Sequence, residues 1–237
     1  ALDMSADFYL QLENFSAAQV LENRLAAARE GRPLETHGGL AAMARPILDA
    51  VAAPTAAPGG GSVAALSGAL AACLGQMVTQ LSRQKKSQAQ FIEQLSNALA
   101  ELRRAGDALA KAIDEDAAAY EGVMAAFKLA KGTAEEQQKR TEAIQQATRG
   151  AAEVPLRVAE AAAALLGQLG QLEPMVSPSM MSDLRVGRLM AAAAVRGALE
   201  NVAINLESIT DAAYVQAMRA RTATIEKRLD AAKVAVG

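Results

Sequence analysis

The feature that most constrains this chain is a stretch without any charged residue over residues 51–82. It opens around two prolines and three consecutive glycines and continues as SVAALSGALAACLGQMVTQLS. A helix that is apolar on every side must be enclosed by protein or by lipid. A membrane span needs about 20 strongly apolar residues, whereas this run contains Ser67, Gly75, Gln76 and much alanine. The stretch therefore predicts a helix surrounded by protein, and we expect no membrane partner.

Helix signals recur along the rest of the chain, and strand signals are nearly absent. Aromatic residues make up 3% of the chain and tryptophan is missing, so alanine, leucine and valine must fill the interior, and alanine favours helices. Long helices with short loops are typical of an antiparallel bundle. We therefore predict an all-α fold, an antiparallel bundle of long helices. The expected helices cover about 17–30, 40–52, 62–84, 90–130, 134–169, 183–206 and 210 onward. Thr133 with Glu136 has the spacing of a capping box, Ser182 or Asp183 is the expected cap of the helix over 183–206, and Thr210 opens the last helix.

Composition excludes several classes of function. The net charge is −2 and the acids and bases are mixed along the chain, which gives no electrostatic footprint for nucleic acid. A single cysteine, Cys73, and a single histidine, His37, exclude a disulfide framework, a cysteine-based zinc cluster and a two-histidine metal site. We expect no metal and a reducing, cytoplasmic location.

The helix expected over 90–130 has one acid in an otherwise apolar face. The positions of this face are spaced by three and four residues, and Asp116 lies in their middle, whereas Asp114 points to the opposite side. A buried carboxylate is unfavourable unless it is paired or used. Asp116 is therefore a candidate catalytic residue, with an ion pair to an arginine or a helix cap as the structural alternative. The other residues of the face are Leu109, Ile113, Tyr120, Val123 and Phe127.

The glycine turn, Gly59, Gly60 and Gly61, directly precedes Ser62. A phosphate-binding P-loop would need a lysine after the last glycine, and a dinucleotide-binding loop would need a preceding strand; this turn has neither. What remains is bare backbone amides at a helix N-terminus, which attract anionic or electron-rich groups. The alternative is a tight turn whose glycines provide a positive φ angle or a close approach between helices.

Five segments resemble, in order, the cyclodeaminase domain of formiminotransferase-cyclodeaminase, a family that also contains bacterial methenyltetrahydrofolate cyclohydrolases. They read PGGGSVAALSGALAACLGQMV, LSRQKK, DEDAAAYEGVMAAFKLAKGTAEEQQKR, SDLRVG and NVAINL. The resemblance extends from about residue 40 to the end. It implies an all-helical dimer and an ammonia lyase that converts 5-formiminotetrahydrofolate to 5,10-methenyltetrahydrofolate. The folate is then the substrate, and no cofactor is required.

The first residues carry a resemblance of their own. SADFYLQLENFSAAQVLENRL is similar to the end of the formiminotransferase part and its connector in the bifunctional proteins. We therefore predict a connector over 1–35 and the helical cyclodeaminase domain over 36–237. The resemblance implies a fused formiminotransferase domain as a partner, with this chain as the C-terminal portion of a longer polypeptide.

The reaction needs a proton donor, a proton acceptor and a carboxylate that balances the cationic methenyl product. Asp116 and Asp183 match the family motifs and are the predicted catalytic residues, although Asp183 could simply cap its helix. Lys85 and Lys86 suit the carboxylates of the folate glutamate tail, and a solvated helix end is their structural alternative. The predicted substrate-binding residues are Gly59, Gly60, Gly61, Ser62, Ser82, Lys85, Lys86 and Lys131.

Spacing limits which of these residues can act together. Asp183 and Asn201 lie on one predicted helix, about 27 Å apart at about 1.5 Å per residue, so they cannot both reach one reacting carbon from one subunit. We favour a core or dimer contact for Asn201 and its neighbour Asn205.

The chain departs from the family pattern at three places. Ser82 and Gln84 stand where the family often has threonine and glycine. An alanine at 130 stands where proline is common, and a Gly-Asn pair before Ser182 is missing. Methenyltetrahydrofolate cyclohydrolase activity and a non-catalytic folate-binding helical dimer therefore stay open as alternatives.

A homodimer is expected from the residues as well as from the resemblance. Ser67, Ala71 and Gly75 recur every four residues on the uncharged helix, and AAAAVRGALENVAINL offers a second surface of small residues. One bundle of about six helices can rarely cover so many apolar faces, so a partner subunit should cover some of them.

Overall fold

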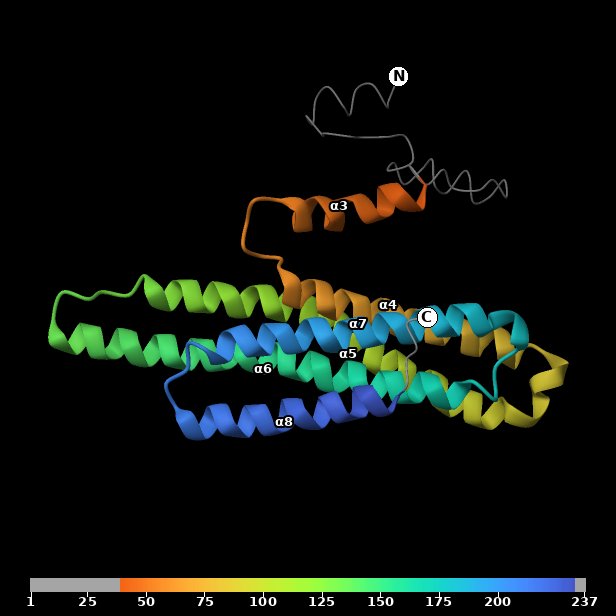
Figure 1. Cartoon of the computed structure of the whole chain (residues 1–237). Helices are drawn as coiled ribbons and strands as arrows, with labels where there is room; N and C mark the ends of the chain where they lie inside the picture. The colour runs from red at the N-terminus through yellow and green to blue at the C-terminus, as the bar shows by residue number, and fades with distance from the viewer. Residues whose placement is uncertain (1–38, 233–237) are drawn as a thin grey trace, which may run out of the picture. The chain divides into compact units, whose positions relative to one another are not determined.

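The computed structural model describes residues 39–232, and every element in this range is helical (Figure 1). The predicted all-α class is confirmed, while the helix expected before residue 39 lies outside the described residues. The elements are α3 (Leu40–Ala52), α4 (Gly60–Arg83), η2 (Lys86–Phe91), α5 (Ile92–Phe127), α6 (Ala134–Leu172), η3 (Pro178–Met180), α7 (Met181–Leu206) and α8 (Ala212–Ala231), of which η2 and η3 are 3-10 helices.

The chain divides into two compact units, Ala1–Ala53 and Pro54–Gly237. Among the described residues, the first unit contains only α3, which matches the helix predicted over 40–52 and buries none of its residues. The second unit contains α4 to α8. The predicted boundary between residues 35 and 36 lies outside the described range, so the connector stays a prediction.

Four helices, α4 to α7, build the core of the second unit. α4 packs against α5 and α7, and α6 packs against the same two helices. Gly68 of α4 lies against Leu109 of α5 and Ala194 of α7, and Asn205 near the end of α7 donates a hydrogen bond to Ala151 of α6. These contacts, together with the Ser62–Asp116 and Gln76–Leu102 hydrogen bonds, join α4 to α5 and α7, and α7 to α6.

Small residues let α4 pass close to its neighbours. A Cβ atom at Gly75 would lie 2.6 Å from Cδ2 of Leu169, and one at Gly68 would lie 3.1 Å from the side chain of Leu109. A side chain at either position would require the facing leucine side chain to shift. The buried residues of α4 are Gly61, Ser62, Ala64, Ala65, Gly68, Ala69, Ala71, Ala72, Gly75, Val78, Thr79 and Ser82.

Within the second unit, the described residues do not enclose α4 on every side. By length and composition, α4 and Pro178–Leu206 could each cross a membrane, and 56% of the apolar window of α4 is buried in the bundle. Burial in protein thus accounts for part of its apolar character, as predicted. The remaining apolar residues leave an exposed side on this helix, including Val63, Leu70 and Met77.

The helix ends confirm some predicted signals and correct others. Thr133 and Glu136 form the predicted capping box of α6. The prediction that Ser182 or Asp183 caps a helix is wrong, because α7 begins at Met181 and its N-cap makes no side-chain hydrogen bond.

α4 begins at Gly60 rather than at Ser62. Asp211, one residue after the predicted Thr210, caps α8 by accepting hydrogen bonds from two backbone amides.

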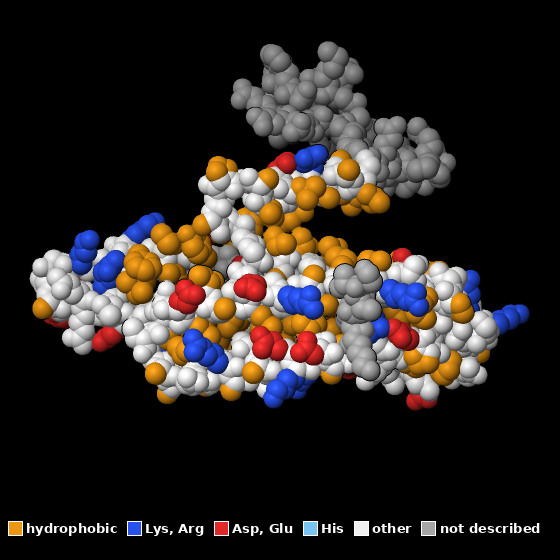
Figure 2. Space-filling model, viewed as in Figure 1, with side chains coloured by type: hydrophobic (Ala, Val, Ile, Leu, Met, Phe, Trp, Pro, Cys, Tyr) orange, Lys and Arg blue, Asp and Glu red, His pale blue; other side chains and the backbone are white. Residues whose placement is uncertain are grey.

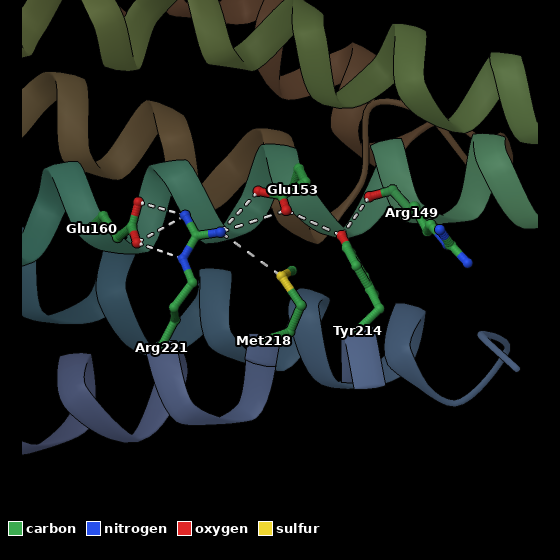
Figure 3. A network of polar contacts seen from close by, with 6 residues as sticks. All are labelled: Arg149, Glu153, Glu160, Tyr214, Met218 and Arg221. Atoms are coloured by element: carbon green, nitrogen blue, oxygen red, sulfur yellow. Dashed lines mark hydrogen bonds and ion pairs between the residues drawn. The ribbon is translucent and has the colours of Figure 1, made fainter. Parts of the chain in front are cut away.

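A polar network joins α8 to α6 (Figure 3). Arg221 pairs with Glu153 at 3.2 Å and with Glu160 at 3.0 Å. The Tyr214 hydroxyl donates to Glu153 at 3.1 Å. Burial, together with the neighbouring Glu153 carboxylate, raises the pKa of Tyr214 to about 12. Since the buried residues of α8 are only Met218, Ile225 and Leu229, the network is a large part of its attachment.

We expect this network to make the fold sensitive to high pH. The pKa of Tyr214 is higher in the folded chain than its ordinary value near 10, so its stabilising contribution is complete below pH 10 and is lost as the pH rises toward 12. Tyr214→Phe should lower the free energy of unfolding by about 1 kcal/mol at neutral pH. Urea unfolding of both proteins between pH 7 and 11.5 checks this, and a difference that stays constant above pH 10 would contradict it.

Candidate functional site

The first turn of α4 lies directly against the Asp116 side chain of α5. A Cβ atom at Gly61 would lie 2.6 Å from Cγ of Asp116, so only glycine leaves room for the carboxylate. The buried Ser62 hydroxyl lies 2.9 Å from Oδ2 of Asp116 and 3.0 Å from the carbonyl oxygen of Ile113, and its single proton can go to one of them at a time. The structure thus brings Gly61, Ser62 and Asp116 together from two helices.

Three consecutive acids on α5 have different environments. Asp114 is exposed. Glu115 pairs with Lys111 at 3.0 Å and with Arg157 at 2.7 Å; hydrogen bonds from these two cations lower the pKa of Glu115, against the opposing effect of its partial burial. Asp116 is half-buried and faces α4. The predicted difference in orientation between Asp114 and Asp116 is confirmed.

Neither of the two structural alternatives for Asp116, an ion pair with an arginine or a helix cap, accounts for its position fully. Within residues 39–232 it takes part in no ion pair with an arginine or lysine. Among the described residues it accepts a hydrogen bond from the Ser62 hydroxyl and none from a backbone amide of α4, so it does not cap that helix in the usual way. Its carboxylate does lie beside the positive end of the α4 dipole, where a negative charge is stabilised. The contact therefore has a structural role and still leaves a carboxylate oxygen, Oδ1, outside the Ser62 hydrogen bond.

The glycine turn is required for close approach rather than for unusual backbone angles. Gly59 has φ −114° and ψ −158°, and Gly60 and Gly61 are already helical. None of the three has the positive φ that the sequence analysis offered as one reason for glycine. A Cβ atom at Gly59 would lie 3.1 Å from the carbonyl oxygen of Ala56, and one at Gly60 would lie 3.2 Å from Nδ2 of Asn201. Side chains and backbone thus surround the turn closely.

Asn201 is a residue of this site that the sequence analysis set aside. Its Nδ2 donates to the carbonyl oxygen of Gly197 at 2.8 Å, and its side chain lies against Gly60. Its neighbour Asn205 donates instead to Ala151 and to the Asn201 carbonyl, as expected of a core contact. The four-residue spacing of the two asparagines showed that they share a face, but it could not show which end of α4 they meet.

A second group of predicted residues lies at the other end of α4. Ser82 follows Ser62 by twenty residues, which is about 30 Å along the helix. Its buried hydroxyl accepts a hydrogen bond of 2.9 Å from the backbone amide of Ser177, and this ties the end of α4 to the segment before α7. Lys85 and Lys86 follow directly and are exposed.

Asp183 belongs to this second group. It lies in the first turn of α7, and α7 runs opposite to α4, since Gly187 lies against Ala71 and Leu74 while Asn201 lies against Gly60. Within one chain, Asp183 and Asp116 are therefore at opposite ends of α4. The two predicted catalytic acids do not meet in a single subunit.

Lys131 belongs to neither group. It is exposed in the loop between α5 and α6, and its carbonyl oxygen accepts a hydrogen bond from Gln137. Eleven residues of α5 separate Asp116 from Phe127, which is about 16 Å of helix. In Figure 1 the ends of α5 and α6 project past the rest of the bundle at this point.

A groove between α6 and α8 contains none of the predicted residues; it is lined by Glu160, Ala220, Arg221, Thr224, Ile225 and Arg228. Over residues 39–232, no three or more histidine, cysteine, aspartate and glutamate side chains gather so as to hold a metal ion.

Comparisons with known proteins all point to the same family. The sequence profile described as formiminotransferase-cyclodeaminase matches residues 43–224. The formimidoyltransferase-cyclodeaminase of Gallus gallus is 39% identical over 193 residues, which are 81% of this chain and 35% of that protein. A similar protein from Rattus norvegicus is 36% identical over 78% of this chain and 34% of its own length. The chain thus spans about a third of the length of these relatives.

Two shorter proteins match over most of their own length. The methenyltetrahydrofolate cyclohydrolase of Methylorubrum extorquens is 32% identical over 169 residues, 71% of this chain and 81% of that protein. The crystal structure of formiminotetrahydrofolate cyclodeaminase from Thermotoga maritima superposes with a TM-score of 0.71 at 26% identity, covering 83% of this chain and 92% of that one.

We expect Gly61→Ala to displace Asp116 and to destabilise the bundle. The new methyl group would overlap the carboxylate, and an overpacked contact costs about 1–3 kcal/mol. The matched control is Gly122→Ala on α5, where nothing lies within 4 Å and alanine should stabilise the helix by about 0.5–1 kcal/mol. Urea unfolding measures both. Equal stabilisation by the two substitutions would show that the first turn of α4 has room for a side chain.

Proposed function

Because this chain belongs to the formiminotransferase-cyclodeaminase family, we propose that its bundle converts 5-formiminotetrahydrofolate to 5,10-methenyltetrahydrofolate and releases ammonia. The vertebrate relatives have names that combine two activities, and the chain matches only about a third of their length. The Thermotoga maritima protein, which the chain covers to 92%, has the cyclodeaminase name alone. This supports the choice of that activity for a chain of this extent.

The observation that carries the proposal is the position of Asp116. Its carboxylate is oriented by Ser62, lies beside the first turn of α4 and has no ion-pair partner within residues 39–232. A carboxylate that is neither neutralised by a cation nor fully exposed can exchange protons with a substrate and can balance a developing positive charge. The adjacent Glu115 is unsuited to this, because Lys111 and Arg157 already pair with it.

The proposed steps need one such group. Nitrogen 10 of the folate attacks the carbon of the protonated formimino group, and the carboxylate of Asp116 accepts the proton that this nitrogen loses. The same carboxyl group then donates a proton to the formimino nitrogen of the tetrahedral intermediate, and the carbon–nitrogen bond breaks to release ammonia. The product is a cation, so the carboxylate that remains stabilises it. We propose that Gly59, Gly60, Gly61 and Ser62 hold the substrate beside this acid.

Methenyltetrahydrofolate cyclohydrolase activity is the second candidate. The Methylorubrum extorquens relative with that name is covered to 81% by this chain. The same carboxylate could then accept a proton from water as the water attacks the methenyl carbon. Ammonia release from 5-formiminotetrahydrofolate supports the first activity, whereas decay of the methenyl absorbance without ammonia supports the second. Folate binding without either reaction would indicate a non-catalytic binding protein.

We also propose that the antiparallel bundle assembles as a homodimer, works in the cytoplasm without a metal or redox cofactor, and is joined to a formiminotransferase domain. The exposed apolar side of α4 supports the dimer, since apolar surfaces of this kind usually mark an interaction site. Light scattering at micromolar concentration measures the mass, and an active, folded monomer would contradict the dimer.

We expect Asp116→Asn to lower kcat at least a hundredfold while leaving the fold intact. The amide keeps the shape of the side chain but cannot accept a proton or balance a cation, and a positioned acid–base group typically contributes about 10²–10⁴-fold. The matched control is Asp114→Asn, two residues away and exposed, which should keep nearly full activity. Initial rates of ammonia release, with circular dichroism as the test of folding, decide between them. Similar losses in both variants would remove Asp116 from the proposed chemistry.

A further inference from the structure

Asn201 and Asp116 contact successive residues of the first turn of α4 from two different helices. A Cβ atom at Gly60 would lie 3.2 Å from Nδ2 and 3.6 Å from Oδ1 of Asn201, which belongs to α7. A Cβ atom at Gly61 would lie 2.6 Å from Cγ of Asp116, which belongs to α5. Gly60 is exposed, and the two side chains beside it are half-buried. A molecule that covers Gly60 from outside would therefore reach both of them.

The amide group of Asn201 is oriented by one hydrogen bond. Its Nδ2 donates to the carbonyl oxygen of Gly197 at 2.8 Å, one turn earlier on the same helix. A carbonyl oxygen can only accept, so the atom that faces it must be the nitrogen. Within residues 39–232, Oδ1 of Asn201 accepts no hydrogen bond, since Asn205 donates to the backbone oxygen of Asn201 instead. Oδ1 is therefore available to a ligand that donates a hydrogen bond.

The backbone of this turn supplies donors rather than acceptors. The Val63 amide bonds to the Gly59 carbonyl at 3.0 Å, and the three helical amides before it have no earlier carbonyl of the helix to bond. Side chains of the described residues do not cap the turn. A ligand group that itself donates hydrogen bonds needs acceptors. The side-chain acceptors that contact this turn within residues 39–232 are the carboxylate of Asp116 and the amide oxygen of Asn201.

Charge over the surface does not by itself select a cationic substrate. Figure 2 shows acidic and basic side chains interspersed on the visible face of the bundle, and the net charge of the chain is −2. A cleft lined by one sign of charge attracts the opposite charge over a distance, whereas a mixed surface does so weakly. Recognition of a protonated formimino group therefore depends on individual contacts at the site.

We propose that Asn201 is a specificity-determining residue, whose Oδ1 accepts a hydrogen bond from the formimino nitrogen of the substrate. This assignment rests on the proposed function and extends it to recognition of the leaving group. An amide oxygen binds an N–H group without removing its proton, so the formimino carbon stays electrophilic until nitrogen 10 attacks it. Asn201 then holds the amino nitrogen of the intermediate while Asp116 donates a proton to it, and the nitrogen leaves as ammonia.

This contact distinguishes a formimino folate from a formyl folate. 5-Formyltetrahydrofolate has nearly the same shape, but an oxygen replaces the formimino nitrogen. That oxygen cannot donate a hydrogen bond, so it would face Oδ1 of Asn201 with one acceptor against another. A site built to bind a donor rejects an analogue that lacks it, because the acceptor of the site is left unpaired. Asn201 thus selects the substrate that can release ammonia.

Replacing the amide by an apolar group of similar size tests this selection. Asn201→Leu removes the acceptor, so kcat/KM for 5-formiminotetrahydrofolate should fall at least tenfold. The inhibition constant of 5-formyltetrahydrofolate in the same assay should stay within about twofold of the wild-type value, because no favourable contact to it is lost. Equal weakening of both ligands would show that Asn201 only supports the glycine turn, and no change in either would show no contact. Each of these two results would overturn the proposal.

Two further variants separate recognition from damage to the fold. Asn201→Ala removes the amide without adding volume beside Gly60, and it should give the same selective loss even if the leucine variant does not fold. Asn205→Ala is the matched control one turn further along α7. Its side chain bonds to Ala151 and to the Asn201 backbone, so the ratio of the two ligands should stay at the wild-type value. A selective loss in this control equal to that of Asn201→Ala would overturn the assignment.

The same measurements distinguish this inference from the proposed function. A wild-type protein that releases ammonia while Asn201→Ala keeps its preference for the formimino ligand would overturn the role of Asn201 alone. A wild-type protein that binds both folates but releases no ammonia would overturn the proposed reaction. Calorimetric dissociation constants then replace kcat/KM, and a selective loss of the formimino ligand in Asn201→Ala would still support the contact.

Discussion

The rest of the structure depends on how closely α4 can be approached. Its buried positions are almost all glycine, alanine or serine, so the backbones of α5 and α7 come near enough for their polar side chains to reach its first turn. With a larger residue at Gly61 or Gly68, the facing side chain of α5, Asp116 or Leu109, would have to shift. The close packing of α4 and the placement of Asp116 therefore depend on the same small residues.

The same contact explains how an uncompensated carboxylate is tolerated at a half-buried position. The Ser62 hydroxyl lies within hydrogen-bond distance of the carboxylate, and the positive end of the α4 dipole lies beside it. A nearby arginine or lysine would stabilise the carboxylate more strongly and would also remove its capacity to exchange protons. Glu115, one residue away, shows that outcome: two cations pair with it and its pKa is lowered. The difference between these neighbours comes from which helix each one faces.

Much of this arrangement could be predicted from the sequence, and the reasons for the remainder are physical. Periodicity placed Asp116 and Asp114 on opposite faces, and the Thr133–Glu136 spacing located the start of α6. Periodicity describes one helix at a time, however, and it says nothing about the height at which two helices meet. For that reason the sequence could not show that Asn201 meets the glycine turn, or that Asp183 lies toward the far end of α4. Local capping signals also failed where a 3-10 turn precedes the helix, as η3 does at α7.

Long straight helices impose a general limit on sites built from a single bundle. Residues near the two ends of one helix stay about as far apart as the helix is long, because neither end can bend toward the other. A small bundle can therefore gather side chains at one level but cannot join the two ends of α4 around a single ligand.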